Sequence, residues 1–251
     1  MGWIPRVLSA VSDIAGDPYA VLFCCIGVSL LLLSSVLNIR SLLSRSAHDY
    51  APVMAYFASF FVLMFLVPMV LVLIEGPRAR MYPWTLGLRL GDWPKGLAIF
   101  GISSPLLVVS VLLGSRDPAL QEHYPFSKEA MAGPGRFVLY EFCYVAFYYL
   151  AWEFAFRGVI LFGLLAFLPR TIPGVAVAIM VQTFLSTIYH VGHPNSEVFG
   201  AFLLGLVAGA ATVVTGSILY GLLFHAMAGV LNDWMAYRRL RRKRPPGREA
   251  A

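Results

Sequence analysis

The chain has 251 residues, of which 59% are hydrophobic and only 13% are charged. Soluble domains carry about 25% charged residues, so this composition excludes an ordinary soluble domain and predicts an integral, multi-pass membrane protein. The net charge of +6 does not predict nucleic-acid binding, because seven of the nineteen Lys and Arg residues lie in one basic cluster at residues 238–248. A basic cluster directly after a membrane span is typical of the cytoplasmic side, and membrane lipids are expected partners.

Charge-free apolar segments predict the membrane-spanning helices. A helix needs about 20 apolar residues to cross a bilayer, and spans are predicted at residues 18–39, 51–74, 96–115, 137–168 and 171–190. The segment 198–233 is interrupted by Thr215, Gly216 and Ser217, which predicts a hairpin of two short helices. The sequence therefore predicts an all-α fold, a polytopic transmembrane helical bundle with seven or eight spans.

Three segments of this pattern carry further expectations. Pro105 predicts a kink in the span 96–115. The segment 116–136 is the longest polar loop and contains His123 but no motif. Residues 137–168 would form a helix of roughly 50 Å at the usual rise per residue, so this helix is expected to be tilted, bent or split.

Glu153 and Arg157 stand out because they lie inside the apolar run 144–168. Charged side chains within a membrane span are costly, so they are usually paired and functional. A spacing of four residues places both on one face of a helix, one turn apart. The pair can satisfy itself in lipid and present a carboxylate to a buried cavity.

The C-terminal half gathers further polar residues in its apolar segments. These are Glu141, His190, His193, Glu197, His225, Asn232 and Asp233. Imidazoles and carboxylates serve a metal site, a metal-free hydrolase with a glutamate base, or a proton-coupled carrier. The spacing of His190, His193 and Glu197 is not the HExxH pattern of zinc proteases. The residue types alone leave these three chemistries open.

Three local sequences narrow the choice: WEFAFRG at 152–158, STIYHVGHPNSE at 186–197 and TGSILYGLLFHAMAGVLND at 215–233. Together they resemble the CPBP family of intramembrane proteases, also called the type II CAAX prenyl endopeptidase or ABI family. The phrase LGLRLGDWPKG at 86–96 is similar to the segment that precedes this domain in bacterial members. The resemblance implies three parts: N-terminal transmembrane helices at 1–83, a protease core at 84–234 and a basic cytoplasmic tail at 235–251.

The resemblance also implies an activity. Family members are intramembrane endopeptidases in which glutamate and histidine activate water for peptide-bond hydrolysis inside a conical cavity. The expected substrate is a peptide or a membrane or secreted protein. No cofactor is expected, and a zinc ion, if one were bound, would be held by His190 and His225. The expected location is a bacterial inner membrane with a cytoplasmic C-terminus.

The first motif carries over with one departure. When Arg157 is aligned with the family arginine, Glu153 takes the position of the second family glutamate. Trp152 stands where the family has its first glutamate, the residue usually taken as the general base. Glu197, in the stretch after His190, can supply a second carboxylate. The expected base is therefore Glu153 or Glu197, with Arg157 orienting Glu153.

The second and third motifs supply the expected histidines. His190 matches the second motif, although Ser186 stands where the family has phenylalanine. His225 matches the third motif, although Gly229 stands where the family has asparagine or aspartate. Asn232 is the expected orienting residue in its place, but lies further along the helix. His190 and His225 are expected to polarise the scissile carbonyl and stabilise the oxyanion.

Trp152 supports a second hypothesis, that of a catalytically silent family member. Such a protein would serve as a membrane scaffold or bind peptides without cleaving them. A proton-linked carrier has less support, because the sequence shows no inverted repeat and no paired broken helices.

Overall fold

The computed structural model describes residues 26–36, 49–79 and 81–242, and every regular element in these ranges is a helix. This confirms the predicted all-α class. The described helices, in chain order, are Ile26–Val36, α3 (Tyr50–Phe61), α4 (Val67–Ala79), α5 (Trp93–Gly114), α6 (Pro118–His123), α7 (Pro134–Cys143), α8 (Leu150–Glu153), α9 (Gly163–Phe167), α10 (Ile172–Ile188), α11 (Asn195–Thr215) and α12 (Leu219–Arg242).

Four of the described helices are long and apolar enough to cross a membrane. They are Tyr50–Ile74, Trp93–Gly114, Pro134–Ala166 and Asn195–Thr215, and Ile26–Val36 and Ile172–Ile188 are shorter apolar helices. The chain is therefore a multi-pass membrane protein, and the finer count of seven or eight spans stays a prediction. The predicted span 18–39 is described only over 26–36, and the tail beyond residue 242 lies outside the described residues.

The helix at the centre of the bundle is the long one that carries Glu153. It runs without a break from α7 to α9, joined by π-helical segments at Tyr144–Tyr149 and Phe154–Phe162. In its most apolar window 78% of the residues are buried, against 6% for α5. Of the three expected alternatives, a tilted, a bent or a split helix, the structure excludes the split helix. Wider π-helical turns, which are frequent at functional sites, flank Glu153 instead.

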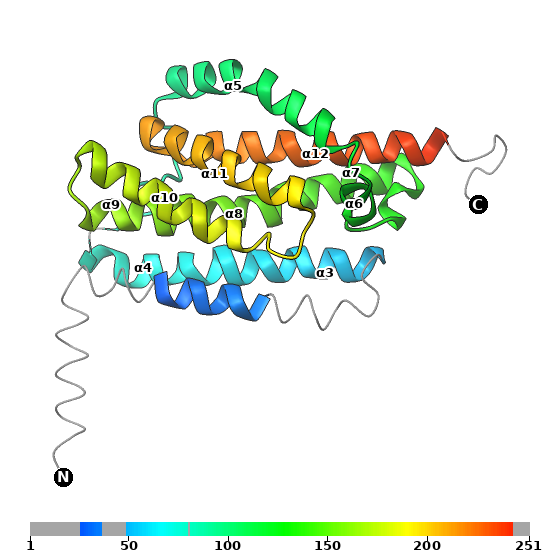
Figure 1. Cartoon of the computed structure of the whole chain (residues 1–251). Coiled ribbons are helices and arrows are strands. Elements are labelled where there is room, and N and C mark those ends of the chain that lie inside the picture. Colours follow the sequence, from blue (N-terminus) through cyan, green and yellow to red (C-terminus); the bar gives the residue numbers. More distant parts are fainter. Residues whose placement is uncertain (1–25, 37–48, 80, 243–251) are drawn as a thin grey trace, which may run out of the picture.

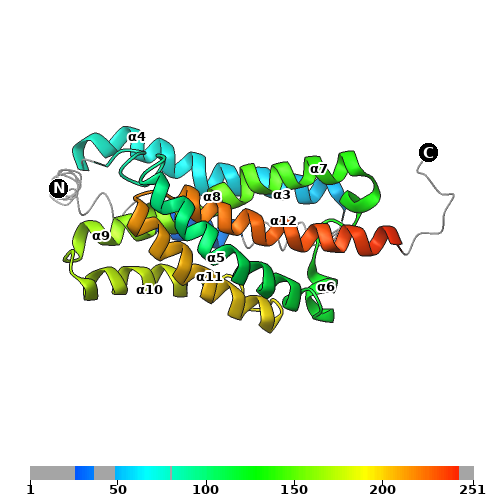
Figure 2. The same cartoon turned by 90° about the horizontal axis from the view of Figure 1, so that it is seen from above.

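The other helices surround this central one. In Figure 1, α3 and α4 lie on one side of it with the helix 26–36, and α11, α12 and α5 lie on the opposite side. Figure 2 shows α5 crossing over α11 and α12, and α5 bends along its length in Figure 1, as expected from Pro105. Because α5 is the least covered of the long helices, its outer face is available to lipid.

Local signals set where several helices begin and end. The Asp92 carboxylate accepts a hydrogen bond from the backbone N–H of Lys95 and caps α5. The Thr171 hydroxyl accepts one from the backbone N–H of Gly174 and caps α10. Gly216 ends α11 with φ of 68°, a left-handed conformation that glycine adopts without strain. This turn makes α11 and α12 the predicted hairpin.

The segment before α5 is bonded to the turn of that hairpin. The Arg89 Nε–H donates to the Gly216 carbonyl at 2.9 Å, and the Ser217 hydroxyl donates to the Arg89 carbonyl at 2.5 Å. The backbone N–H of Ile218 donates to the Gly87 carbonyl at 3.0 Å. These bonds join segments about 130 residues apart in the chain and hold the start of α12 in place.

We expect Gly96→Ala to destabilise the fold. A Cβ at Gly96 would overlap the ring of Tyr220 on α12, whereas a Cβ at Gly101, on the same helix, would meet no atom within 4 Å. Overpacking of this kind costs about 1–3 kcal/mol. Thermal unfolding in detergent should show a lower midpoint for Gly96→Ala. The control Gly101→Ala should match wild type or exceed it slightly, and equal midpoints for the two variants would contradict the close contact.

Candidate active site

A cavity of about 510 Å³ lies between the central helix, α5, α11 and α12. Its walls are mostly aliphatic and aromatic, and its charged or ionisable lining includes Tyr124, Arg157, His190, His193, Glu197, His225 and Asp233. Apolar walls with a few convergent polar groups are typical of binding and catalytic sites. Three of the four predicted catalytic residues, His190, Glu197 and His225, line this cavity. Glu153 does not.

Glu153 lies behind His225. Its side chain is fully buried, and its Oε1 atom lies 3.0 Å from His225 Nδ1 and 3.3 Å from Arg157 Nη1. An ionised carboxylate can only accept hydrogen bonds, so His225 donates its Nδ1–H to Glu153. The tautomer and orientation of the imidazole are thereby set by the carboxylate, and the Tyr149 ring stacks on the same imidazole with 4.1 Å between centroids. Glu153 thus reaches the cavity through His225.

Gly221 on α12 makes room for this carboxylate. A Cβ at that position would lie 2.5 Å from Glu153 Oε2. This oxygen is buried and has no hydrogen-bond partner among the described residues. Glycine in the sequence is therefore required by the close approach of α12 to the charged pair.

Glu197 is the centre of a second polar group. Its Oε1 atom accepts a hydrogen bond from the Tyr124 hydroxyl at 2.6 Å and one from His193 Nδ1–H at 2.8 Å. His190 Nε2 lies 3.9 Å from the same oxygen. Because His190 Nδ1 lies 3.0 Å from the Ser186 carbonyl, which can only accept, this imidazole donates from Nδ1 and has Nε2 as its acceptor.

His190 sits in the connector between α10 and α11, where burial lowers the pKa of its imidazole to about 4, partly offset by the carboxylate of Glu197. The imidazole is therefore neutral near pH 7. Its Nε2 lone pair faces the Glu197 carboxylate, so one proton donor placed between them can bond to both.

Trp152, which the family resemblance aligns with the first glutamate of the motif, contacts both predicted histidines. Its indole meets His190 edge to face with 5.4 Å between centroids, and meets His225 in the same way at 6.0 Å. The side chain is 3% exposed and packs on Phe60 and Phe156 of the aromatic core. The indole therefore forms an apolar wall where the family pattern has a carboxylate.

Asn232 and Asp233 also line the cavity, whereas Glu141 does not. Asn232 Nδ2 lies 3.3 Å from the Asp233 carboxylate, which also accepts a hydrogen bond from the Tyr140 hydroxyl at 3.2 Å. The orienting role of Asn232 stays a prediction. Glu141 is buried near Asp233, and neither of its carboxylate oxygens has a hydrogen-bond partner among the described residues.

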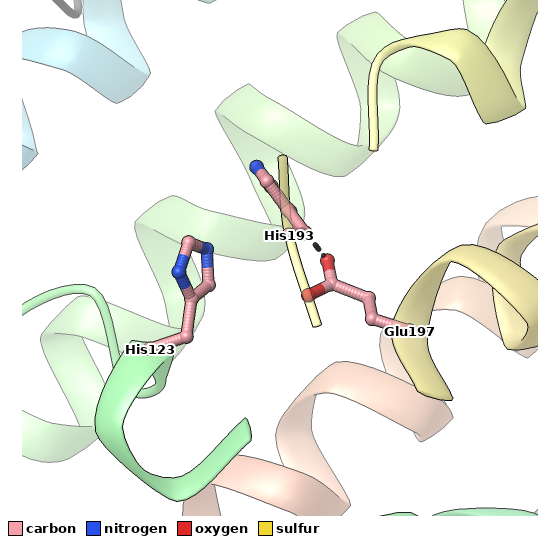
Figure 3. Close-up of side chains that lie close together, drawn as sticks. All are labelled: His123, His193 and Glu197. Atoms are coloured by element: carbon pink, nitrogen blue, oxygen red, sulfur yellow. Dashed lines mark hydrogen bonds and ion pairs between the residues drawn. The ribbon is translucent and has the colours of Figure 1, made fainter. Parts of the chain in front are cut away.

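No sequence motif predicts two residues of the site. His123 and Tyr124 lie in the polar loop 116–136, in which no motif was recognised. In the structure Tyr124 bonds to Glu197, and the His123 ring lies 4.3 Å from the His193 ring, centroid to centroid. Figure 3 shows His123, His193 and Glu197 converging from three segments. A lone histidine in a polar loop was the available signal, and its partners are about 70 residues away.

The potential metal ligands that the structure gathers are His123, His193 and Glu197, with ligand atoms all within 4.8 Å of one another. A metal ion at His190 and His225 stays a prediction.

A helical bundle with membrane-spanning helices, an apolar cavity and carboxylate–histidine pairs agrees with the intramembrane hydrolase expected from the sequence. The comparison with protein families agrees: residues 134–231 match the family model described as "Type II CAAX prenyl endopeptidase Rce1-like". The chain therefore carries a domain of the Rce1-like type II CAAX prenyl endopeptidase family, a family of hydrolases. No curated protein and no solved structure matches the chain.

The match confirms the predicted family. It includes Glu153, His190, Glu197 and His225, whereas His123 and Tyr124 precede it. The predicted core boundary at residue 84 lies 50 residues before the start of the match at residue 134 and stays a prediction.

We expect Glu153→Ala to destabilise the protein strongly, because it leaves the 2% exposed Arg157 guanidinium buried without its partner. Removing one partner of a buried ion pair costs about 3–5 kcal/mol. Thermal unfolding in detergent should show a large fall in midpoint. Adding Arg157→Met should recover most of the loss, and a double variant less stable than Glu153→Ala would contradict the pairing.

Proposed function

We propose that the protein is an intramembrane endopeptidase in which Glu197 and His190 activate the attacking water. The observation that carries this proposal is the 3.9 Å separation of His190 Nε2 and Glu197 Oε1 in the wall of the cavity. This distance is too long for a direct hydrogen bond and suits one water molecule bonded to both groups. The family domain supports the same reaction class.

The base role falls to Glu197 because of access. Glu153 is fully buried, is held by His225 and Arg157, and does not line the cavity. Glu197 lines the cavity together with His190. On this proposal Glu197, in the first turn of α11, takes the role of the family's first glutamate, whose aligned position holds Trp152.

The reaction then has ordinary steps of acyl transfer to water. Glu197 takes one proton from the water while its oxygen forms a bond to the scissile carbonyl carbon. The oxyanion of the tetrahedral intermediate accepts a hydrogen bond from Nε2–H of His225, so this step requires His225 to carry a proton on both ring nitrogens while its Nδ1–H donates to Glu153. The C–N bond breaks as the proton from Glu197 passes to the leaving amine, so that a carboxylic acid and a neutral amine are released.

The buried charges suit this transition state. In this step the Glu153 carboxylate lies between the Arg157 guanidinium and the doubly protonated His225 that the proposal requires. The negative charge of the oxyanion that develops in the apolar cavity compensates the net positive charge of this group. A preorganised charge in a water-poor site stabilises a developing charge more than it would in bulk water.

The cavity supports an apolar substrate segment. Aliphatic residues of α5 and α11, including Leu106, Leu107, Leu203 and Leu204, line it together with the aromatic core. The proposed substrate is a peptide or membrane protein that presents its scissile bond from the lipid phase. We place the protein in a bacterial inner membrane with its C-terminus on the cytoplasmic side. Basic residues gather on the cytoplasmic side of membrane spans, and α12 ends with Arg238, Arg239, Arg241 and Arg242.

Trp152 favours a second candidate, a family member that binds peptides without cleaving them. Its indole removes the family's first carboxylate and adds apolar surface between the two histidines. Binding of a quenched peptide by the wild-type protein with no cleavage would support this candidate over the hydrolase.

Activity is to be measured on the full chain in liposomes, with internally quenched peptides that have an apolar C-terminus, with and without farnesylcysteine. We expect Glu197→Gln, His190→Ala and His225→Ala each to lower kcat by about 10²- to 10⁴-fold, the usual contribution of acid–base groups. The exposed Glu122→Gln on α6 is the control and should retain the wild-type rate. Full activity of Glu197→Gln together with loss in Glu153→Gln would assign the base to Glu153 instead.

A further inference from the structure

A group of metal-ligand type lies beside the proposed catalytic pair. It consists of His123 at the end of α6, His193 in the connector after α10, and Glu197 in the first turn of α11. Figure 3 shows the three side chains directed toward one another. Two imidazoles and one carboxylate with a fourth position open form a ligand set that zinc takes in proteins.

The distances between the ligand atoms of this group lie on both sides of the distance that a tetrahedral metal ion requires. Ligands at about 2 Å from a tetrahedral zinc ion are about 3.3 Å apart. His193 Nδ1 and Glu197 Oε1 are 2.8 Å apart, and all the ligand atoms lie within 4.8 Å of one another. Shifts of about 1 Å or slightly more would therefore close the group around an ion, and His123 and His193 both lie in or beside connectors.

The carboxylate has one oxygen to offer. Tyr124 and His193 both donate to Glu197 Oε1, while Oε2 is buried and has no hydrogen-bond partner among the described residues. A buried carboxylate oxygen without a donor is energetically unfavourable. A cation bound to Glu197 Oε2 would remove that cost. This argument for a cation does not depend on the distances between the ligand atoms.

The connector that brings His123 is already bonded to α11. The Ser196 hydroxyl donates to the Asp117 carboxylate at 2.6 Å, and the Tyr124 hydroxyl donates to Glu197. Asp117 and Tyr124 flank α6 in the chain, so both ends of this short helix are held against the start of α11. The ligand His123 is thereby positioned by the fold before any ion binds.

We propose that His123, His193 and Glu197 form a binding site for a divalent transition-metal ion of the zinc class. The site lies partly outside the matched domain, because His123 precedes residue 134. An ion there ties the connector 115–133 to α11.

The site also has a regulatory consequence, which rests on the proposed function. A metal ion bound to the Glu197 carboxylate competes with the proton of the attacking water for that carboxylate. Occupancy of the site therefore lowers the rate of peptide cleavage, and chelation raises it.

Metal binding is tested first without any substrate. The full chain in detergent is freed of metal with a chelator and titrated with Co²⁺, with absorbance as the readout, and Zn²⁺ is then added in competition. We expect one Co²⁺ per chain with the intense visible bands of a tetrahedral ion. His123→Ala should weaken binding by about 100-fold or more, since even outer-shell changes cost 10- to 100-fold. The neighbouring exposed Glu122→Ala is the control and should bind as wild type does.

His123→Cys identifies the ligand directly. A thiolate at this position should add a sulfur-to-cobalt charge-transfer band that the wild type lacks. The variant remains informative if alanine at this position disturbs the fold, because its readout is a new band rather than a loss. Equal affinity in wild type and His123→Ala, or the absence of the new band, would overturn the site.

The regulatory consequence is tested separately on peptide cleavage. The Zn²⁺ concentration that halves the wild-type rate should match the affinity from the competition titration, and it should rise about 100-fold in His123→Ala. Activation by Zn²⁺, or loss of activity on chelation, would overturn the inhibitory role while leaving the binding result intact. Absence of any cleavage would contradict the proposed function alone, since metal binding is measured without it.

Discussion

The burial of one carboxylate in a membrane-spanning helix constrains much of this structure. Glu153 is fully buried, so it needs cationic or donor partners in a region without water. Arg157 supplies a charge one turn away, and His225 supplies an N–H from α12. Glycine at 221 lets α12 approach closely enough for that bond. The packing of α12 against the central helix thus includes a hydrogen bond from His225 and a close approach at Gly221, both to this carboxylate.

The same constraint sets the chemistry of the cavity. Once Glu153 is committed to Arg157 and His225, it holds the imidazole of His225 in one orientation instead of facing the cavity. The position next to it is filled by Trp152, whose ring contacts both His225 and His190 edge to face. A carboxylate for water must then come from another element, and Glu197 at the start of α11 is the one that faces His190. The proposed base and the proposed oxyanion donor therefore come from α11 and α12 and line the same cavity.

Dependence on Glu197 also makes the proposed reaction open to control. The carboxylate that faces His190 is bonded to Tyr124 and His193, and His123 stands beside them. Glu197 is both the proposed proton acceptor and one of the proposed metal ligands, so a proton and a metal ion compete for its carboxylate. The polar connector 115–133 thereby gains a role that its composition alone did not indicate.

The sequence by itself determined the class of the protein, the central charged pair and the family domain. Hydropathy predicts helices in lipid because the backbone must satisfy its own hydrogen bonds there, and a spacing of four residues pairs Glu153 with Arg157 on any helix. The motifs located His190, Glu197 and His225 because each lies in a local pattern. Only the tertiary structure decided which carboxylate faces the cavity and that His123 and Tyr124 belong to the site. Those facts depend on contacts between segments about 70 residues apart, made by the way α6, α11 and α12 pack, and no local pattern encodes them.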